Sequence, residues 1–213
     1  MHIPDGFLDL KTIVATGVAS AGALSYSIKK SKEELNERQL PALGIMSAFI
    51  FAGQMINFPV AGGTSGHLLG AALATVLLGP WSASLVLATV LIVQALFFQD
   101  GGITALGAGI FNMAVVAVFI AHVAYTLAGK LRVNEYAACF VAAWLSVMAA
   151  STATALELAI SGTVPLAAAL PAMTSVHALI GVGEGIITAV AVMFVKGFNK
   201  SNIARDASLQ RGD

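Results

Sequence analysis

The sequence is poor in charge and in cysteine. Only 10% of its 213 residues are charged, against roughly 25% in a typical soluble domain, whereas 58% are hydrophobic and the mean hydropathy is +0.87. The formal net charge of zero gives no indication of a nucleic-acid partner. The single cysteine, Cys139, excludes an intramolecular disulfide and forms no metal-binding motif, so we interpret it as a packed apolar residue. This composition predicts one bundle of membrane helices rather than soluble domains.

Motifs of catalysis and of ATP hydrolysis are also missing. The sequence contains no His-Glu-x-x-His zinc motif and no Walker A motif, Gly-x-x-x-x-Gly-Lys-Ser/Thr. Its last apolar segment has no lysine near the centre that could form a retinal Schiff base. These absences exclude a zinc protease of that type and a retinal-binding protein, and any ATP hydrolysis must come from separate subunits. A transport subunit that is not an enzyme is the interpretation that the resemblance described below favours. An intramembrane enzyme or another seven-helix receptor is the alternative.

Seven apolar segments follow one another along the chain. They cover residues 8–28, 41–58, 67–79, 81–98, 108–130, 136–160 and 175–195. The third differs from the others, because its apolar run from Leu68 to Leu78 is shorter than the roughly 17–25 residues of a spanning helix. Either its helix begins within the preceding Gly-rich run, residues 61–66, or irregular backbone reaches membrane depth inside the protein.

Lysine and arginine predict the orientation in the membrane. They cluster after the first, fifth and seventh segments, whereas the loops at 59–66, 99–107 and 161–174 contain neither residue. By the positive-inside rule, the side that carries the clusters is cytoplasmic. The sequence therefore predicts an all-α, polytopic protein of the inner (cytoplasmic) membrane, with seven transmembrane helices, an external N-terminus and a cytoplasmic C-terminus.

The first residues hold the donor atoms of a metal chelate. The Met1 amine, the His2 amide nitrogen and the His2 imidazole can close fused five- and six-membered rings on one ion and leave one corner of a square plane open. An amide is deprotonated by metals that gain strongly from a square-planar nitrogen field, Cu(II) and Ni(II). We expect Met1 to be retained because His2 is bulky, and Pro4-Asp5-Gly6 predicts a tight turn that folds the terminus back. A disordered start before a helix is the other interpretation of these residues.

His67 is a candidate for the open corner. It follows the Gly-rich run at 61–66 and lies on the same predicted side of the membrane as the N-terminus. Taken alone, a histidine at a helix start is more often structural, so the incomplete chelate is what favours a ligand role. Three polar residues, Asn57, Gln54 and Ser65, are candidates for orienting the metal-bound imidazoles, although hydrogen bonding within the bundle explains them equally well.

Other residues in the spans have weaker interpretations. We favour structural roles for His122 and His177. Glu157 lies near the predicted outer face and could attract cations, while Glu184 has no partner that the sequence identifies. The second segment also carries a stripe of small residues, Gly44, Ala48 and Ala52. Such a stripe lets another helix approach closely, either inside this bundle or from a partner protein.

Four stretches of the sequence form a distinctive combination. They are Met1–Leu8, Leu43–Ala52, Gln54–Val60 and Gly63–Leu68. Together they resemble the CbiM/NikM family, the substrate-binding membrane subunits, or S components, of energy-coupling factor (ECF) transporters for nickel and cobalt. The resemblance extends over nearly the whole chain. It implies that a metal is held by the Met1 amine, the His2 amide nitrogen and imidazole, and the His67 imidazole, with the N-terminus plugged into the bundle centre.

The resemblance also implies an organisation and a set of partners. A transmembrane domain at 1–198 would contain a metal-binding segment with an extra helix (1–28), a cytoplasmic loop (29–40) and a six-helix core (41–198), before a polar cytoplasmic tail (199–213). The partners would be ABC-type ATPase subunits and a transmembrane coupling subunit that contacts the small-residue stripe, with a small accessory membrane subunit as a further candidate. Nickel is the expected cargo because four planar nitrogens favour Ni²⁺ over Co²⁺, and cobalt is the alternative.

Overall fold

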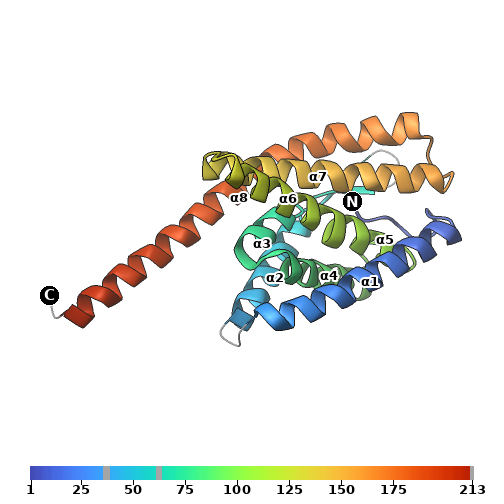
Figure 1. Cartoon of the computed structure of the whole chain (residues 1–213). Helices are drawn as coiled ribbons and strands as arrows, with labels where there is room; N and C mark the ends of the chain where they lie inside the picture. Colours follow the sequence, from blue (N-terminus) through green and yellow to red (C-terminus); the bar gives the residue numbers. More distant parts are fainter. Residues whose placement is uncertain (36–38, 61–63, 212–213) are drawn as a thin grey trace.

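The computed structural model describes residues 1–35, 39–60 and 64–211, with side chains as far as residue 198. Most of this chain is helical, as predicted (Figure 1). The helices are α1 (Leu10–Glu34), α2 (Leu40–Gln54), α3 (Ala71–Leu78), α4 (Pro80–Phe97), α5 (Leu106–Ile110), α6 (Ala117–Lys130), α7 (Glu135–Ile160) and α8 (Leu166–Arg211). A π-helix, η2 (Phe111–Val116), joins α5 to α6. A small antiparallel hairpin of β1 (Phe58–Val60) and β2 (Thr64–Gly66), which the sequence did not predict, precedes α3.

Four helical segments are long and apolar enough to cross a membrane. They are α4, the continuous α5–η2–α6 segment Leu106–Lys130, α7, and α8 over Leu166–Phe198. These segments identify an integral membrane protein. α2 is apolar but has 15 residues, and α3 has 8. In the part of the chain that the structure describes, four of the seven predicted spans therefore have the length and composition of a membrane helix.

α1 lines its inner face with hydroxyl groups. Its buried residues are Thr12, Thr16, Ser20, Ser27 and Ser31. Small residues let α1 approach α5 closely, because a Cβ on Gly107 would lie 2.7 Å from the Cα atom of Gly17. Ser20 Oγ donates to the carbonyl oxygen of Gly107 at 2.7 Å. The hydroxyl groups thus face protein, where hydrogen-bond acceptors are available.

α1 also continues beyond residue 28, the predicted end of the first segment. It enters the stretch 29–40, where a loop is predicted. The helix runs to Glu34, and Lys30 Nζ lies 2.7 Å from Glu33 Oε2 one turn later. Ser31 is buried with its Oγ 3.4 Å from Ser82 Oγ of α4. Lysine and glutamate are good helix formers, so the change to polar residues does not end the helix. Residues 36–38 of the predicted loop lie outside the described residues.

α8 is longer than predicted at both ends. It begins at Leu166 rather than near 175, because the alanines that follow Leu166 are strong helix formers. Its backbone stays helical to Arg211, where the sequence predicts a polar tail at 199–213. In Figure 1 the C-terminal part of α8 extends away from the rest of the bundle.

α7 and α8 lie side by side and antiparallel (Figure 1). Two glycines of α8 face aromatic rings of α7: a Cβ at Gly181 would lie 2.9 Å from Trp144 Cδ1, and one at Gly185 would lie 2.5 Å from Phe140 Cδ2. Trp144 Nε1 donates to the carbonyl oxygen of Ala178 at 3.2 Å. These contacts fix the register of α8 against α7, and with it the face of α8 that points into the bundle.

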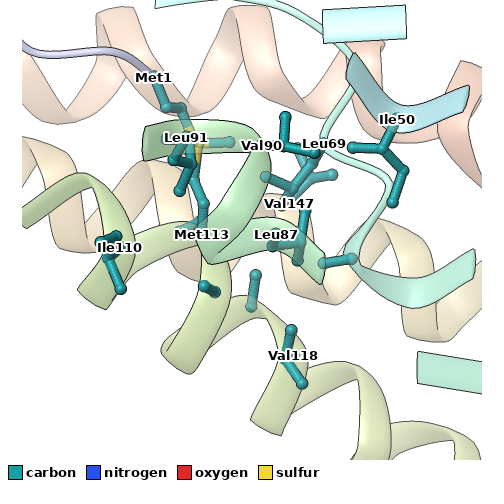
Figure 2. Close-up of a cluster of buried hydrophobic side chains, with 14 of the residues drawn as sticks. Met1, Ile50, Leu69, Leu87, Val90, Leu91, Ile110, Met113, Val118 and Val147 are labelled. Atoms are coloured by element: carbon teal, nitrogen blue, oxygen red, sulfur yellow. The ribbon is translucent and has the colours of Figure 1, made fainter. Parts of the chain in front are cut away.

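The first three residues fold into the bundle and are buried. Met1 is 0% exposed and joins a buried apolar cluster (Figure 2). Neighbours in this cluster include Leu91 of α4, Met113 of η2 and Val147 of α7. The predicted tight turn is present, because the Phe7 N–H donates to the carbonyl oxygen of Pro4 at 3.4 Å and Gly6 has a φ of 83°.

The loop between α4 and α5 holds this N-terminal segment in place. The Gly102 N–H donates to the carbonyl oxygen of Ile3 at 2.8 Å. Asp5 Oδ1 accepts hydrogen bonds from the Thr104 hydroxyl and the Thr104 N–H, which hold the pKa of Asp5 below its usual value. A Cβ on Gly102 would lie 2.4 Å from the Asp5 nitrogen, so glycine is required for this close approach.

Candidate metal centre

The segment between β2 and α3 carries His67. Residues 67–70 are neither strand nor helix, and the helix begins only at Ala71. Of the two alternatives for the third apolar segment, the structure therefore has irregular backbone, which is enclosed by protein. His67 is 1% exposed. Gly70 has a φ of 78° and lies so close to Ile50 that a Cβ would be 2.8 Å from Ile50 Cγ1.

Glu184 and Gln54 hold this segment from two sides. The Glu184 carboxylate of α8 accepts hydrogen bonds from the Leu69 N–H at 2.7 Å and the Gly70 N–H at 2.9 Å. These N–H groups lie at the start of α3, where the helix supplies no acceptors. Gln54 Nε2 donates to the carbonyl oxygen of Leu69 at 2.8 Å. Gln54 therefore positions the loop that carries His67, and Glu184 ties this loop to α8.

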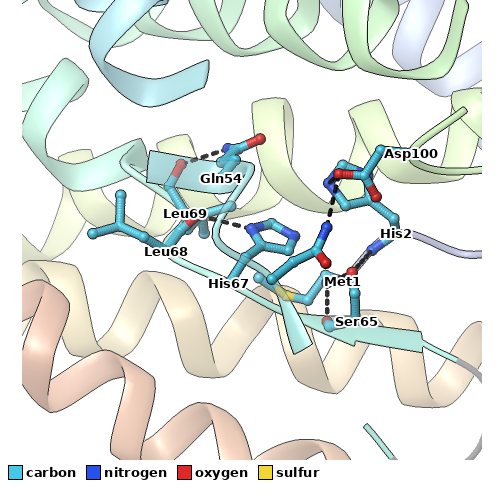
Figure 3. A network of polar contacts seen from close by, with 9 residues as sticks. Met1, His2, Gln54, Ser65, His67, Leu68, Leu69 and Asp100 are labelled. Carbon is cyan, nitrogen blue, oxygen red and sulfur yellow. Dashed lines mark hydrogen bonds and ion pairs between the residues drawn. The ribbon is translucent and has the colours of Figure 1, made fainter. Parts of the chain in front are cut away.

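The N-terminus meets the same loop at Ser65 (Figure 3). The Met1 amine donates to the Ser65 carbonyl oxygen and, at 3.1 Å, to Ser65 Oγ. The His2 backbone N–H also donates to Ser65 Oγ, at 3.1 Å. Ser65 therefore contacts two of the nitrogens that the predicted chelate contains.

The imidazole rings of His2 and His67 lie against each other. Their centroids are 4.6 Å apart, with an angle of 28° between the ring planes. Two imidazoles that bind adjacent positions of one ion through bonds of about 2 Å have centroids roughly 4–5 Å apart. The separation is therefore compatible with a shared ion.

Hydrogen bonds select the tautomer of His67. Its Nδ1 lies 2.7 Å from the carbonyl oxygen of Leu68, and a carbonyl can only accept, so Nδ1 carries the proton. The other ring nitrogen, Nε2, is then an unprotonated donor. It is buried and, within the part of the chain that the structure describes, has no hydrogen-bond partner. This is the arrangement that a histidine ligand needs.

The N-terminal nitrogens are also neutral. Burial lowers the pKa of the Met1 amine from 8.0 to about 4, against the opposing effect of the nearby Asp100 carboxylate. Burial, with the amine as a second cause, lowers the pKa of His2 to about 3. Both lone pairs are therefore free at neutral pH. No group of three His, Cys, Asp or Glu side chains capable of holding a metal occurs among residues 1–35, 39–60 and 64–211.

Asp100 is a residue of this site that the sequence analysis missed. Its Oδ2 lies 3.7 Å from His2 Nε2 and accepts a hydrogen bond from Asn57 Nδ2 at 3.0 Å. Burial raises the pKa of Asp100. A carboxylate on the Nε2 side favours the tautomer with a free Nδ1, the nitrogen that closes the six-membered chelate ring. Asn57 thus acts on His2 through Asp100, and a pocket of about 580 Å³ adjoins all three residues.

The small-residue stripe of α2 lies on the surface of the part of the chain that the structure describes. Gly44, Ala48 and Ala52 are all exposed. A Cβ on Gly44 would meet nothing within 4 Å. Of the two explanations left open by the sequence, the structure favours a surface available to a partner.

Glu157 belongs to a separate buried network. Its Oε2 accepts a hydrogen bond from Asn112 Nδ2 at 2.6 Å, and the same amide lies 3.2 Å from Thr154 Oγ1. Glu157 is 7% exposed, so it does not present a cation-attracting surface as the sequence suggested. His122 is exposed on α6, whereas His177 is buried in α8.

Comparison with known proteins places this architecture in a family. The family model described as "Cobalt uptake substrate-specific transmembrane region", CbiM, matches residues 2–201. A fused nickel transport protein NikMN of Archaeoglobus fulgidus is 43% identical over 211 residues, which are 98% of this chain and 70% of the relative. Cobalt transport protein CbiM 1 of Pelobacter propionicus is 32% identical over 212 residues, covering 95% of this chain and 94% of the relative.

Solved structures agree. A crystal structure of a transition metal transporter is 36% identical, covers 100% of both chains and superposes with a TM-score of 0.91. The matches agree with the predicted transport role and identify a membrane component of metal uptake. The chain belongs to the CbiM family of cobalt uptake substrate-specific transmembrane proteins.

Proposed function

We propose that this chain is the substrate-binding subunit of an ECF-type transporter that takes up nickel or cobalt across the inner membrane. The observation that carries this proposal is the convergence of four nitrogen donors in one buried place. They are the Met1 amine, the His2 amide and imidazole, and the His67 imidazole. Three come from the chain terminus and one from the β2–α3 segment, so the site exists only when the N-terminal segment is docked.

Each donor is prepared for an incoming ion. The amine and the His2 ring are kept neutral by burial, and His67 offers an unprotonated Nε2. The amide is the only donor that must lose a proton, and its N–H points at Ser65 Oγ beside the pocket. Binding would exchange the amine's hydrogen bonds to Ser65 for a bond to the ion.

Nickel is our first choice of cargo. Four nitrogens in a plane, one of them an ionised amide, suit Ni(II) better than Co(II). Relatives of this chain are named as transporters of either metal. The Asp100 carboxylate beside His2 adds negative charge that attracts either cation and does not discriminate between them.

We further propose seven spans, with the N-terminus outside. The distribution of hydrophobic residues on α1 supports this, because its exposed face is apolar while its buried face carries hydroxyl groups. The exposed residues include Leu10 (74%), Val14 (54%) and Val18 (69%). An apolar outer face on a helix with a polar inner face is suited to lipid rather than to water. The arrangement of an extra helix before a six-helix core at 41–198 follows from the same proposal.

The proposed partners are a transmembrane coupling subunit and ABC-type ATPase subunits, with a small accessory membrane subunit as a further candidate. The exposed stripe of Gly44, Ala48 and Ala52 on α2 supports a helix contact with the coupling subunit, because small residues let two backbones approach. ATP hydrolysis would then move the α2 face and the docked metal site together.

The metal content of the purified chain tests the proposal. We expect one nickel or cobalt ion per chain after purification without chelator, and competition between the two metals measures the preference. His67→Ala should lose most of the affinity because it removes one of four nitrogens, whereas His122→Ala, a change of the same size at an exposed site, should bind normally. An intramembrane enzyme or another receptor would contain neither metal at a stoichiometric level.

A further inference from the structure

A third histidine is prepared in the same way as His67. His177 in α8 is 0% exposed, and its Nδ1 lies 2.7 Å from the carbonyl oxygen of Met173. Because that carbonyl can only accept, Nδ1 carries the proton and Nε2 is an unprotonated donor. This Nε2 is buried and has no hydrogen-bond partner among residues 1–35, 39–60 and 64–198. Leaving such a group unpaired has a cost in stability, so it calls for an explanation.

The face of α8 that carries His177 runs along the segment from β2 to α3. Met173, one turn before His177, accepts a hydrogen bond on its sulfur from Thr64 Oγ1 at 2.9 Å. Three residues after His177, Ile180 Cδ1 lies 3.1 Å from the position of a Cβ on Gly66. One turn further, the Glu184 carboxylate accepts hydrogen bonds from the Leu69 and Gly70 N–H groups.

His177 lies in the middle of this face. Its neighbours on α8 contact residues 64, 66, 69 and 70 in order, so the imidazole lies beside the stretch that contains Ser65 and His67. His177 therefore borders the segment that carries His67, although among the described residues it does not form a metal-holding group of three with His2 and His67.

We propose that His177 is an exchange ligand: its Nε2 binds the metal transiently as the ion enters or leaves the four-nitrogen site. This inference rests on the proposed function. In the exchange step a bond forms between His177 Nε2 and the ion, and the bond from His67 Nε2 breaks. Both are lone-pair donations from neutral nitrogens, so the charge and the oxidation state of the metal do not change.

Coordination chemistry gives the reason for such a residue. A four-coordinate planar ion exchanges its ligands through a five-coordinate species, in which the new donor approaches from outside the plane. Without a further donor, an ion held by four nitrogens would leave slowly. His177 supplies a donor from α8, the helix that Glu184 also connects to the β2–α3 segment.

The kinetics of nickel transfer test the proposal on the full-length chain. We compare the wild type with His177→Gln, which is polar but lacks an imidazole nitrogen, and with His122→Gln as a matched control. Nickel release into excess chelator gives the dissociation rate, and equilibrium competition gives Kd. We expect His177→Gln to slow binding and release equally, by at least about tenfold, or ~1.4 kcal/mol of barrier, with Kd unchanged. His122→Gln should match the wild type.

Rescue separates a chemical role from a packing role. His177→Ala leaves a cavity, and added imidazole should restore rapid exchange there while leaving the rate of His122→Ala unchanged. Unaltered binding and release rates in His177→Gln would overturn the proposal. A weaker affinity with an unaltered binding rate would also overturn it, because this result indicates damage to the resting site. A wild-type chain that binds no nickel would refute the proposed function itself, and the two failures are therefore distinguishable.

Discussion

Extending the N-terminus should abolish the metal site without changing any side chain. A short glycine–serine extension before Met1 converts the free amine into an amide and places His2 well inside the chain. The amine donates to the Ser65 carbonyl and hydroxyl oxygens in a fully buried position, so the added residues have no room beside it. The extension therefore removes one ligand and also prevents the other two N-terminal nitrogens from docking.

The magnitude follows from the number of bonds lost. Changes to residues that only orient a ligand typically cost 10- to 100-fold in metal affinity. Here at least one ligand disappears outright, and the other N-terminal nitrogens cannot dock, so the loss should exceed that range. We expect nickel affinity to fall by more than about 100-fold, or ~2.8 kcal/mol.

Calorimetric titration of nickel into the purified protein measures this effect. The control is the same extension placed after Asp213, which should leave affinity unchanged. A one-residue extension is a poorer probe, because His2 becomes the third residue and the amine, two amides and imidazole could chelate nickel without the pocket. Binding of that kind would be insensitive to His67→Ala. If the long extension binds one nickel as tightly as the native chain, the first residues are not the site.

Three further predictions follow from the same geometry. Asp100→Asn removes the carboxylate beside His2 and should weaken nickel binding by about 10- to 100-fold; unchanged affinity by titration would exclude Asp100 from the site. Burial lowers the pKa of the Met1 amine from 8.0 to about 4 and the pKa of His2 from 6.5 to about 3. Between the two pKa values of each group, the undocked segment therefore binds more protons than the docked segment. Docking should therefore strengthen as pH rises from about 5 to 8 and weaken as it falls, and hydrogen exchange of the N-terminal amides measures it; equal protection at both pH values would contradict this. Ala48→Leu or Ala52→Leu should bind metal normally but co-purify less coupling subunit, and undiminished co-purification would indicate that the partner binds elsewhere.

The sequence predicted the parts of this protein that depend on local chemistry. The turn at Pro4–Phe7 follows from proline and glycine and is confirmed, whereas the donor set of Met1 and His2, which rests on covalent structure alone, stays a prediction. Apolar length predicted the long helices α4, α7 and the segment Leu106–Lys130 within a few residues. It failed at the ends of α1 and α8, because helix formation continues through polar residues that favour helices.

Gln54, Asn57 and Ser65 were candidates from the sequence, but Asp100 could not be predicted, because its position depends on a contact between distant parts of the chain. Asp100 faces His2 only after the α4–α5 loop has closed on the N-terminal segment through Gly102. An acidic residue followed by two glycines in a loop without lysine or arginine was the one available signal. It carries no information about which histidine the carboxylate approaches.

The register of α8 explains why Glu184 and His177 were the hardest to interpret. Sequence shows both as isolated polar residues in an apolar helix, without a direction. The direction is set by Gly181 and Gly185, which can approach Trp144 and Phe140 only on the face turned towards α7. That choice turns the neighbouring face towards the β2–α3 segment, where the Glu184 carboxylate finds N–H groups and His177 lies between residues that contact this segment. Two glycines of α8 thus determine which of its side chains face the segment that carries His67.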